Sequence, residues 1–215
     1  MRIVIVSDLH NHFREITLPD GDVFIDCGDQ TRKGELSIIE DYAAWLKGLP
    51  HKHKLVIFGN HELGFQIGPK REPAIEMIRK AGAEYLEDSS VEIDDIMFYG
   101  SPWQPEFHHW EWNLPRGKAL AMKWAEIPEK CNVLITHGPP QGILDDAFGI
   151  PAGCQDLLER IVYLSGLGHL RLAASGHIHR DHDEQPIEKF GVKFCNASIC
   201  NNAYKPLNSP VVIDI

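Results

Sequence analysis

Five short apolar runs in the sequence each end in side chains that can bind a metal ion or transfer a proton. The runs are RIVIVS, DVFIDC, KLVIFG, NVLITH and RLAASG, and the reactive residues that end or follow them are Asp8, His10, Asp29, Asn60, His61, His137, His177 and His179. A single Asp or His after a strand is more often a turn residue or a helix cap than a ligand. Five runs that all end in this way are much harder to assign to turns. Imidazole, carboxylate and amide ligands suit Mn²⁺, Fe or Zn²⁺, so the pattern predicts a metal centre.

Two pairs of these residues, Asp8 with His10 and His177 with His179, are separated by a single residue. In an extended chain such pairs point to the same side, with Cα atoms roughly 6 to 7 Å apart. That separation suits ligands of two metal ions about 3.5 to 4 Å apart, the arrangement of two-metal phosphoryl-transfer sites.

The apolar runs also predict the scaffold that brings these residues together. Near-continuous runs rich in Val and Ile are typical of strands buried on both faces of a sheet. Between them, helical periodicity is clear at residues 35–47 and 154–164 and weaker at 72–81 and 116–126. Alternating strands and helices predict an α/β fold with a largely parallel sheet, in which ligands gather at the carboxyl ends of the strands.

Further strand-like pieces break the alternation, three of them in residues 83–100 and one each in residues 192–198 and 209–215. We expect about ten strands in all, too many for one flat sheet. Two packed sheets with helices on both outer faces accommodate them better. The sequence shows no linker, so residues 1–215 are expected to form one domain.

Composition narrows the classes of function. The 215 residues are 43% hydrophobic and 24% charged, as in ordinary globular proteins. The net charge of −10 argues against a broad surface for nucleic acid. The first apolar run is too short for a secretion signal or a membrane span. Five cysteines without a C-x-x-C motif are expected to be reduced and buried, which favours a cytoplasmic protein.

The motifs SDLH, GDQTRKG, GNHE, THGPP and GHIH resemble, in order, the motifs of the calcineurin-like metallophosphoesterases. Each motif alone is weak, but five in order are a strong signal. The stretches YGSPWQPEF, WNLPRG, NASICN and PVVIDI resemble the small subgroup that contains the vertebrate brain metallophosphoesterase-domain proteins. The resemblance implies a four-layer α/β/β/α sandwich, with two packed mixed β-sheets flanked by helices.

The resemblance also implies a ligand set for two divalent metal ions, with Mn²⁺ favoured. The first ion would be held by Asp8, His10 and His179, the second by Asn60, His137 and His177, and both by the bridging residue Asp29. The positive charge of two divalent ions exceeds the negative charge of the two aspartates. An acidic protein could thus attract an anionic phosphoester locally.

In the implied mechanism a metal-bridging hydroxide attacks phosphorus in line, while the ions and Asn60 hold the phosphoryl oxygens. We predict that His61 stabilises the transition state and protonates the leaving oxygen. Its neighbour Glu62 either orients His61 or caps the following segment. Arg32 stands where the serine/threonine phosphatases, which resemble G-D-x-x-D-R-G, would carry an acid, and this departure argues against a protein phosphatase.

Residues 101–117 contain three of the five tryptophans. Such aromatic side chains can stack on a nucleotide base or anchor loops against the core. We expect Trp110 and Trp112 to be anchors. The candidates for substrate contacts are Arg32, Asn60, His61, Trp103, His108, Asn113 and Arg116.

The histidines outside the proposed site have no partner at ligand spacing, so we expect solvated loop positions for them. They are His12, His51, His53, His108, His109, His169 and His182. In particular, the sequence PHKHK is expected to be an exposed turn.

The leading interpretation is a dinuclear metal-dependent phosphodiesterase that acts on small nucleotide esters such as cyclic nucleotides, and this substrate preference comes from the subgroup resemblance. A phosphomonoesterase or a nuclease of the same fold is the alternative, although the net charge disfavours polymeric nucleic acid. A non-catalytic metal-binding scaffold is a further alternative because fold alone does not secure activity. No membrane partner is expected, and the sequence carries no prediction of oligomeric state.

Overall fold

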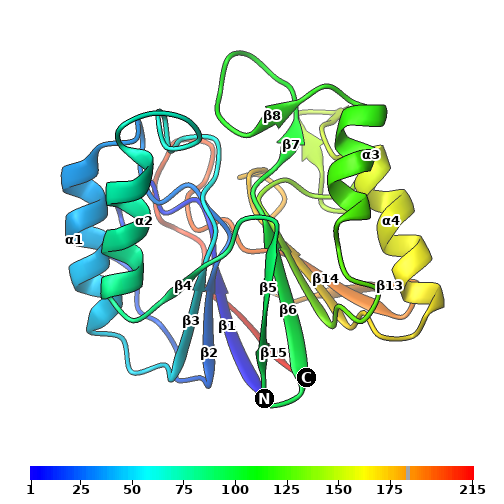
Figure 1. Ribbon diagram of the computed structural model, residues 1–215, viewed down its shortest axis with the longest axis horizontal. Coiled ribbons are helices and arrows are strands. Elements are labelled where there is room, and N and C mark those ends of the chain that lie inside the picture. Colours follow the sequence, from blue (N-terminus) through cyan, green and yellow to red (C-terminus); the bar gives the residue numbers. More distant parts are fainter. Residues whose placement is uncertain (183–184) are drawn as a thin grey trace.

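Two mixed β-sheets pack face to face at the centre of the molecule, and a pair of helices covers the outer face of each sheet (Figure 1). The structure is a computed structural model and describes residues 1–182 and 185–215. This arrangement confirms the four-layer α/β/β/α sandwich implied by the sequence motifs.

The first sheet has five strands. In order across the sheet they are β15 (Val211–Asp214), β1 (Arg2–Val6), β2 (Val23–Asp26), β3 (His53–Val56) and β4 (Glu84–Tyr85). Strands β1 to β4 are parallel, and only the edge strand β15 runs antiparallel to its neighbour β1.

The second sheet has six strands. In order they are β13 (Ile187–Lys189), β14 (Val192–Asn196), β12 (Leu172–Ser175), β9 (Val133–Thr136), β6 (Ile96–Ser101) and β5 (Ser89–Ile93). The four central strands are parallel, and the edge strands β13 and β5 are antiparallel to their neighbours. The prediction of largely parallel pairing is therefore confirmed for both sheets.

Four helices form the outer layers, and each begins and ends within two residues of its predicted bounds. They are α1 (Leu36–Lys47) and α2 (Arg71–Lys80) on the first sheet, and α3 (Lys118–Ala125) and α4 (Gln155–Gly166) on the second (Figure 1). Among the described residues, no helix is long and apolar enough to cross a membrane.

Side chains alternate between an inner core and two outer cores. On β2, Val23 and Ile25 pack between the sheets, whereas Phe24 packs under α1 and α2. On β9, Val133 points inward and Leu134 packs under α3 and α4. Because both faces of each central strand are buried, the strands read as continuous apolar runs.

Two short ladders lie outside the main sheets and are absent from the predicted elements. They pair β7 (Gln104–Pro105) with β8 (Asn113–Leu114), and β10 (Asp146–Ala147) with β11 (Ile150–Pro151). Strands of two residues have too few positions for a periodic pattern to indicate them. The five- and six-stranded sheets together come close to the ten strands expected.

The carboxyl ends of the central strands of both sheets meet at one end of the molecule. A parallel bridge between Ser7 and Ser198 joins the chain after β1 to the chain after β14, and so links the two sheets there. Both chain termini lie at the opposite end (Figure 1). The loops that follow β1, β2, β3, β9 and β12 thus converge in one place.

Candidate metal centre

The seven predicted metal ligands come together at this edge. Asp8 and His10 follow β1, Asp29 follows β2, Asn60 follows β3, His137 follows β9, and His177 and His179 follow β12. The side chains of His177 and His179 are partly buried, and the other five are buried. Five separate loops therefore contribute to one cluster.

The first ligand group consists of Asp8, His10 and His179, whose nearest ligand atoms all lie within 4.8 Å of one another. The Nε2 atom of His179 is 3.2 Å from Oδ1 of Asp8 and 3.1 Å from Nε2 of His10. These three side chains could hold one metal ion.

The second ligand group consists of Asp29, His137 and His177. The Nε2 atom of His137 is 3.4 Å from Oδ2 of Asp29 and 2.9 Å from Oδ1 of Asn60. The same Asp29 oxygen is 3.9 Å from Nε2 of His10, so Asp29 lies between the two groups. This is the position that a bridging ligand requires.

Backbone carbonyl groups fix the tautomers of three ligand histidines. A carbonyl oxygen can only accept, so the Nδ1 atom that faces it carries a proton, and in the neutral ring Nε2 keeps its lone pair. The pairs are His10 with Thr31 (3.1 Å), His137 with Cys27 (2.9 Å) and His179 with Asn201 (3.2 Å). All three Nε2 atoms are thus prepared to bind a cation.

The resulting lone pairs face one another. The Nε2 atoms of His10 and His179 are 3.1 Å apart, and neither carries a proton in the tautomers just described. Two such acceptors repel unless a cation or a proton lies between them. The mixed set of imidazole, carboxylate and amide donors fits divalent Mn, Fe or Zn ions.

Burial and charge tune the ligand groups. Burial lowers the pKa of His10 to about 4 and that of His177 to about 3, so both are neutral near pH 7. Burial also opposes protonation of His137, but the Asp29 carboxylate outweighs it and raises the pKa of His137 to about 9. Burial alone would raise the pKa of Asp8, but His179 outweighs it and holds that pKa well below its usual range. Metal ions would therefore compete with a proton at His137.

The backbone at four ligands is left-handed, with φ of 54° at Asp8, 42° at His10, 61° at Asp29 and 68° at His177. This conformation costs a non-glycine residue roughly 1 kcal/mol or more, and such residues cluster at functional sites. The prediction that the ligand pairs lie in extended chain is therefore wrong. The chain turns at these residues, and this turn places His177 and His179 in different ligand groups.

Two glycines let the ligand loops approach closely. A Cβ atom on Gly59 would lie 2.4 Å from Oδ1 of Asp29, and one on Gly176 would lie 2.4 Å from Oδ2 of Asp8. Real Cβ contacts are not this short, so any larger residue would displace a ligand carboxylate. These contacts give a spatial reason for glycine in GNHE and GHIH.

Glu62 ties two ligand loops together. Its buried carboxylate accepts backbone N–H groups from Gly59 (2.7 Å), Asp29 (3.0 Å) and Thr31 (2.8 Å). It thus joins the loop after β2 to the loop after β3, whereas the sequence suggested only that it orients His61 or caps a segment. The contact to Asp29 spans 33 residues, which no local pattern could indicate.

Polar residues at and just after the end of β14 hold Asp8 and the GHIH segment in place. The Ser198 hydroxyl and the His177 backbone N–H both donate to Oδ2 of Asp8, each at 2.8 Å. The side-chain amide of Asn196 donates to the carbonyl of Ile178 at 2.8 Å. The sequence marked NASICN only by resemblance, without a role for these residues.

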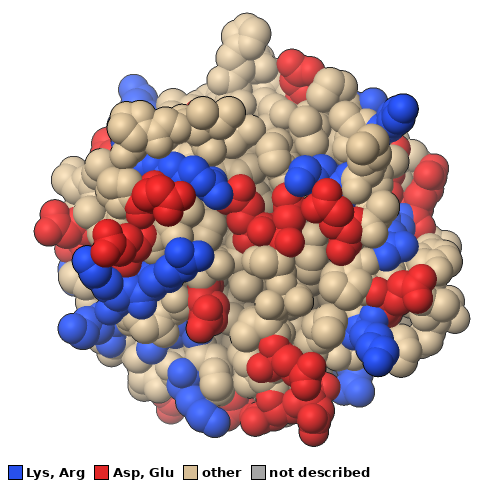
Figure 2. Space-filling model, in the orientation of Figure 1, with Lys and Arg blue, Asp and Glu red and all other residues tan. Residues whose placement is uncertain are grey.

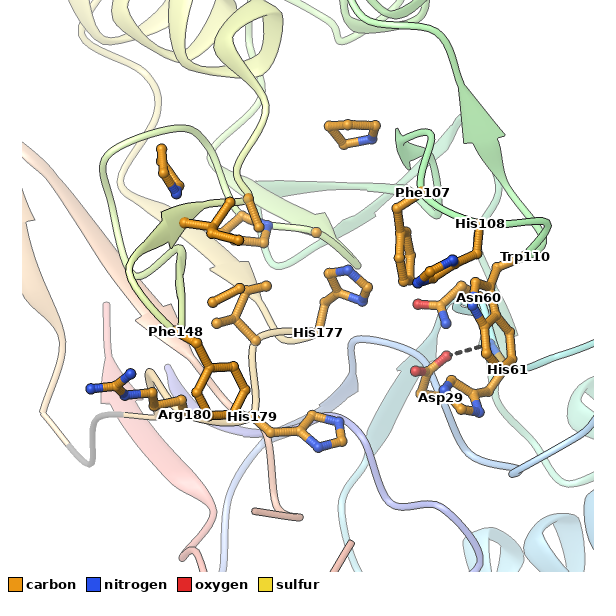
Figure 3. A pocket seen from close by; sticks show the side chains of 18 of the residues that line it. Asp29, Asn60, His61, Phe107, His108, Trp110, Phe148, His177, His179 and Arg180 are labelled. Carbon is orange, nitrogen blue, oxygen red and sulfur yellow. Dashed lines mark hydrogen bonds between the residues drawn. The ribbon is translucent and has the colours of Figure 1, made fainter. Parts of the chain in front are cut away.

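His61 lies beside the cluster with its ring held in place. Its Nδ1–H donates to the Arg32 carbonyl at 2.8 Å, which leaves Nε2 as the acceptor. Its backbone N–H donates to Oδ1 of Asp29 at 2.8 Å (Figure 3). The ring centre is 4.6 Å from that of His10 and 4.3 Å from that of Trp110. His61 also forms a ligand-spaced group with His10 and Asp29.

A pocket of about 480 Å³ opens over the cluster (Figure 3). Its apolar lining includes Phe107, Trp110, Phe148 and Tyr204. Of the residues expected to contact substrate, those that line it are Asn60, His61, His108 and Arg116. Trp110, expected to be an anchor, instead faces this pocket, whereas Trp112 is fully buried as expected.

Three other candidates for substrate contact are not among the lining residues. Arg32 donates to the carbonyl groups of His10 (3.2 Å) and Tyr204 (3.3 Å). The indole of Trp103 donates to Asp88 at 2.9 Å, and Asn113 donates to the Phe107 carbonyl at 2.8 Å. Each of these side chains holds a loop near the site.

The solvated position expected for His51 is wrong. Its ring is buried, its Nε2 pairs with the carbonyl of Pro19 at 3.0 Å, and it packs on Phe24. His53 belongs to β3, so PHKHK leads into the sheet and is not an exposed turn. All five cysteines are free and buried, which confirms the expectation from the sequence.

The four-layer sandwich and the cluster of imidazole, carboxylate and amide ligands define a metallophosphoesterase-type site. A family model described as calcineurin-like phosphoesterase matches residues 1–181. The chain therefore belongs to the calcineurin-like phosphoesterase family.

Relatives cover the whole chain. It is 38% identical over 244 residues to the human metallophosphoesterase domain-containing protein 1, an alignment that covers 100% of this chain and 71% of that protein. The UPF0046 protein K07C11.7 of Caenorhabditis elegans is 33% identical over 225 residues, which cover 100% of this chain and 75% of that protein. These matches confirm the subgroup resemblance.

Solved structures share the fold at low identity. The protein TT1561 of Thermus thermophilus superposes with a TM-score of 0.59 at 10% identity, covering 91% of this chain and 88% of that one. A putative 5'-nucleotidase from Staphylococcus aureus, solved with alpha-ketoglutarate, has a TM-score of 0.53 at 14% identity and covers 100% of this chain and 54% of that one. At these identities the likeness concerns the fold alone.

Proposed function

We propose that the protein is a dinuclear, divalent-metal-dependent phosphodiesterase that acts on small nucleotide esters such as cyclic nucleotides. The observation that carries this proposal is the pair of adjacent ligand groups, with Asp29 lying between them in the lining of the pocket. Family membership supports phosphoester hydrolysis, and the geometry supports two ions.

The seven predicted ligands would hold the ions, with Mn²⁺ favoured and Fe or Zn²⁺ as the alternatives. When bound, the ions supply Lewis acidity, which polarises the phosphoryl group and lowers the pKa of a water molecule. Asp8 and Asp29 contribute negative charge, so the loaded site remains positive and attracts a phosphoester anion.

Two side chains of the protein act on the substrate in this proposal. The amide of Asn60 holds a phosphoryl oxygen, because Asn60 lines the pocket beside Asp29 and His137. His61 donates a proton to the leaving oxygen from Nε2 in its imidazolium form, because Nδ1–H stays bonded to the Arg32 carbonyl. The bond from the His61 backbone to Asp29 fixes the distance between the acid and the metal centre.

The pocket suits a small ester with an aromatic part. Its volume of about 480 Å³ lies within the usual range for small-molecule sites. The ring of Trp110 and the neighbouring Phe107 offer faces on which a base can stack. Acidic and basic side chains are interspersed over the face shown in Figure 2, which does not favour a nucleic acid polymer. The free buried cysteines suit a reducing, cytoplasmic environment.

A substrate panel tests the proposal. Protein loaded with Mn²⁺ is assayed with 3′,5′-cyclic nucleotides, 2′,3′-cyclic nucleotides, bis(p-nitrophenyl) phosphate and p-nitrophenyl phosphate. We expect kcat/KM to be higher for the diesters than for the monoester. A preference for the monoester would favour the phosphomonoesterase, and bound metal without hydrolysis of any ester would favour a scaffold.

A further inference from the structure

Two walls stand on opposite sides of the metal-ligand cluster. Figure 3 shows Phe107 and Trp110 on one side of His177 and Phe148 with Arg180 on the other. All four side chains line the same pocket. We call Phe107 and Trp110 the acid-side wall, because Trp110 contacts His61, and Phe148 with Arg180 the hairpin wall.

The acid-side wall packs directly against His61 and His177. The ring of Trp110 lies 4.3 Å from that of His61, and Phe107 and Trp110 are nearly parallel, with ring centres 6.4 Å apart. Phe107 also packs edge-on against His177 at 5.1 Å. A group bonded to the oxygen that His61 protonates would therefore meet these two rings.

The hairpin wall is carried by the turn between β10 and β11. Phe148 is 71% exposed and lines the pocket, so its ring offers a free face that a ligand can cover. The Arg180 guanidinium lies 5.6 Å from the centre of that ring. The same guanidinium is 3.7 Å from Oδ2 of Asp146. Since Arg180 directly follows His179, this wall is tied to the metal-ligand segment.

A phosphodiester carries two substituents, and the site offers one wall for each. Resting on the proposed function, we propose that besides cyclic nucleotides the pocket takes acyclic phosphodiesters with two planar substituents. The leaving group lies on the acid-side wall, and the group retained on phosphorus lies on the hairpin wall. Water adds to phosphorus and gives up a proton, the bond to the leaving oxygen breaks, and that oxygen takes a proton from the imidazolium form of His61, which the proton from water restores. The products are the free alcohol and a phosphomonoester that keeps the substituent held by Phe148.

Two substrates with the same leaving group isolate the hairpin wall. Methyl p-nitrophenyl phosphate and phenyl p-nitrophenyl phosphate both release p-nitrophenol but differ in the retained group. For the Mn²⁺-loaded full chain, Phe148→Ala should lower the ratio of kcat/KM for the phenyl ester to that for the methyl ester about tenfold, the size of one stacking contact. Phe148→Trp should restore the ratio, because it restores the aromatic face.

Two further variants serve as comparisons. Trp110→Ala should lower kcat/KM for both esters by a similar factor and leave their ratio within about twofold, because the leaving group is common to both. Phe190→Ala is the matched control: Phe190 is 54% exposed in the turn between β13 and β14 and is not among the lining residues. It should leave both rates unchanged.

The outcomes separate this inference from the proposed function. If the unmodified protein with bound metal hydrolyses neither these two esters nor any diester of the substrate panel, the proposed function fails and the inference fails with it. If it hydrolyses cyclic nucleotides but neither of the two esters, only the inference is overturned. If it hydrolyses both but Phe148→Ala leaves their ratio unchanged, only the inference is overturned. A ratio that Trp110→Ala changes as strongly as Phe148→Ala would show that the walls have no separate roles, which also overturns it.

Discussion

Glu62→Gln tests whether a buried charge holds the metal-ligand loops together. Three backbone N–H groups point at the Glu62 carboxylate, at 2.7, 2.8 and 3.0 Å. Gln has one acceptor oxygen, so its NH₂ group would face at least one of these N–H groups. Burial and the neighbouring Asp29 carboxylate raise the pKa of Glu62 well above its usual value, and the N–H groups of Thr31 and Gly59 only partly oppose this rise. The geometry of three N–H donors and no acceptor around the carboxyl group nevertheless favours the ionised form, and Glu62→Gln decides between the two.

The expected cost follows from these contacts. One buried N–H group left without a partner costs about 1–3 kcal/mol, and the remaining bonds lose their charge-assisted strength of about 1 kcal/mol. We therefore expect Glu62→Gln to lower the free energy of unfolding by about 3 kcal/mol. For a domain of this length, that corresponds to a fall in Tm of roughly 6–12 °C.

The measurement is chemical and thermal unfolding of the metal-free protein, so that metal affinity does not enter. Glu76→Gln is the matched control. Glu76 is 64% exposed and pairs with Lys80 on the surface of α2, so Glu76→Gln should change the free energy of unfolding by no more than about 0.5 kcal/mol. If Glu62→Gln is as stable as the unmodified protein, the carboxyl group is neutral in the folded state and our account of the loops is refuted.

Single substitutions test the roles of His61, the buried carboxyl group of Asp26 and the close approach of two loops at Gly176. His61→Asn should leave metal content unchanged but lower kcat about 10²- to 10⁴-fold, and an unaltered kcat would remove His61 from the mechanism. Burial raises the pKa of Asp26 to about 7, whereas the usual pKa of an aspartate is 3.8. Between these two pH values the folded protein keeps a proton that the unfolded chain has lost, so the free energy of unfolding should fall as pH rises from about 4 to 7. Asp26→Asn should flatten this fall in urea unfolding of metal-free protein at about pH 5, 6.5 and 8, and an unchanged slope would contradict the raised pKa. Gly176→Ala places Cβ 2.4 Å from Oδ2 of Asp8, so it should weaken metal binding in calorimetry, and unchanged affinity would show that the loops can separate.

The elements that carry the ligands could be predicted because they are governed by local chemistry. Central strands such as β2 and β9 are buried on both faces, so they read as apolar runs, and the polar residues at their ends stand out. Helix bounds followed from periodicity in the same way. The gathering of these side chains at the carboxyl edge could therefore be predicted from the amino-acid sequence, whereas their assignment as metal ligands came from the family resemblance and stays a prediction.

The hydrogen bonds and the backbone turn that position the site residues could not be predicted in this way. Ser198 bonds to Asp8 across 190 residues of sequence, and Glu62 bonds to Asp29 across 33. No local sequence pattern can indicate contacts between residues so far apart in the chain. The turn at His177 depends on a backbone conformation that the spacing alone does not show. Long-range hydrogen bonds and short ladders are set by tertiary packing rather than by periodicity.

The aromatic walls were missed for a related reason. Phe148 sits between two strands of two residues each, and nothing in its neighbourhood distinguishes it from a loop residue. Trp110 resembled an anchor because most aromatic residues in such segments are buried. Only the fold shows that it lies on His61.

The central claim is that the two ligand groups hold two metal ions, and His177→Gly tests it most directly. His177 has φ of 68°, a conformation that glycine adopts freely, so this change removes the imidazole without straining the backbone. Titration calorimetry with Mn²⁺, together with metal analysis of the purified protein, gives the stoichiometry. We predict two ions per chain in the unmodified protein and one tightly bound ion, with a lower hydrolysis rate, in His177→Gly. A single ion in the unmodified protein, or two equally tight ions in the variant, would contradict the dinuclear site.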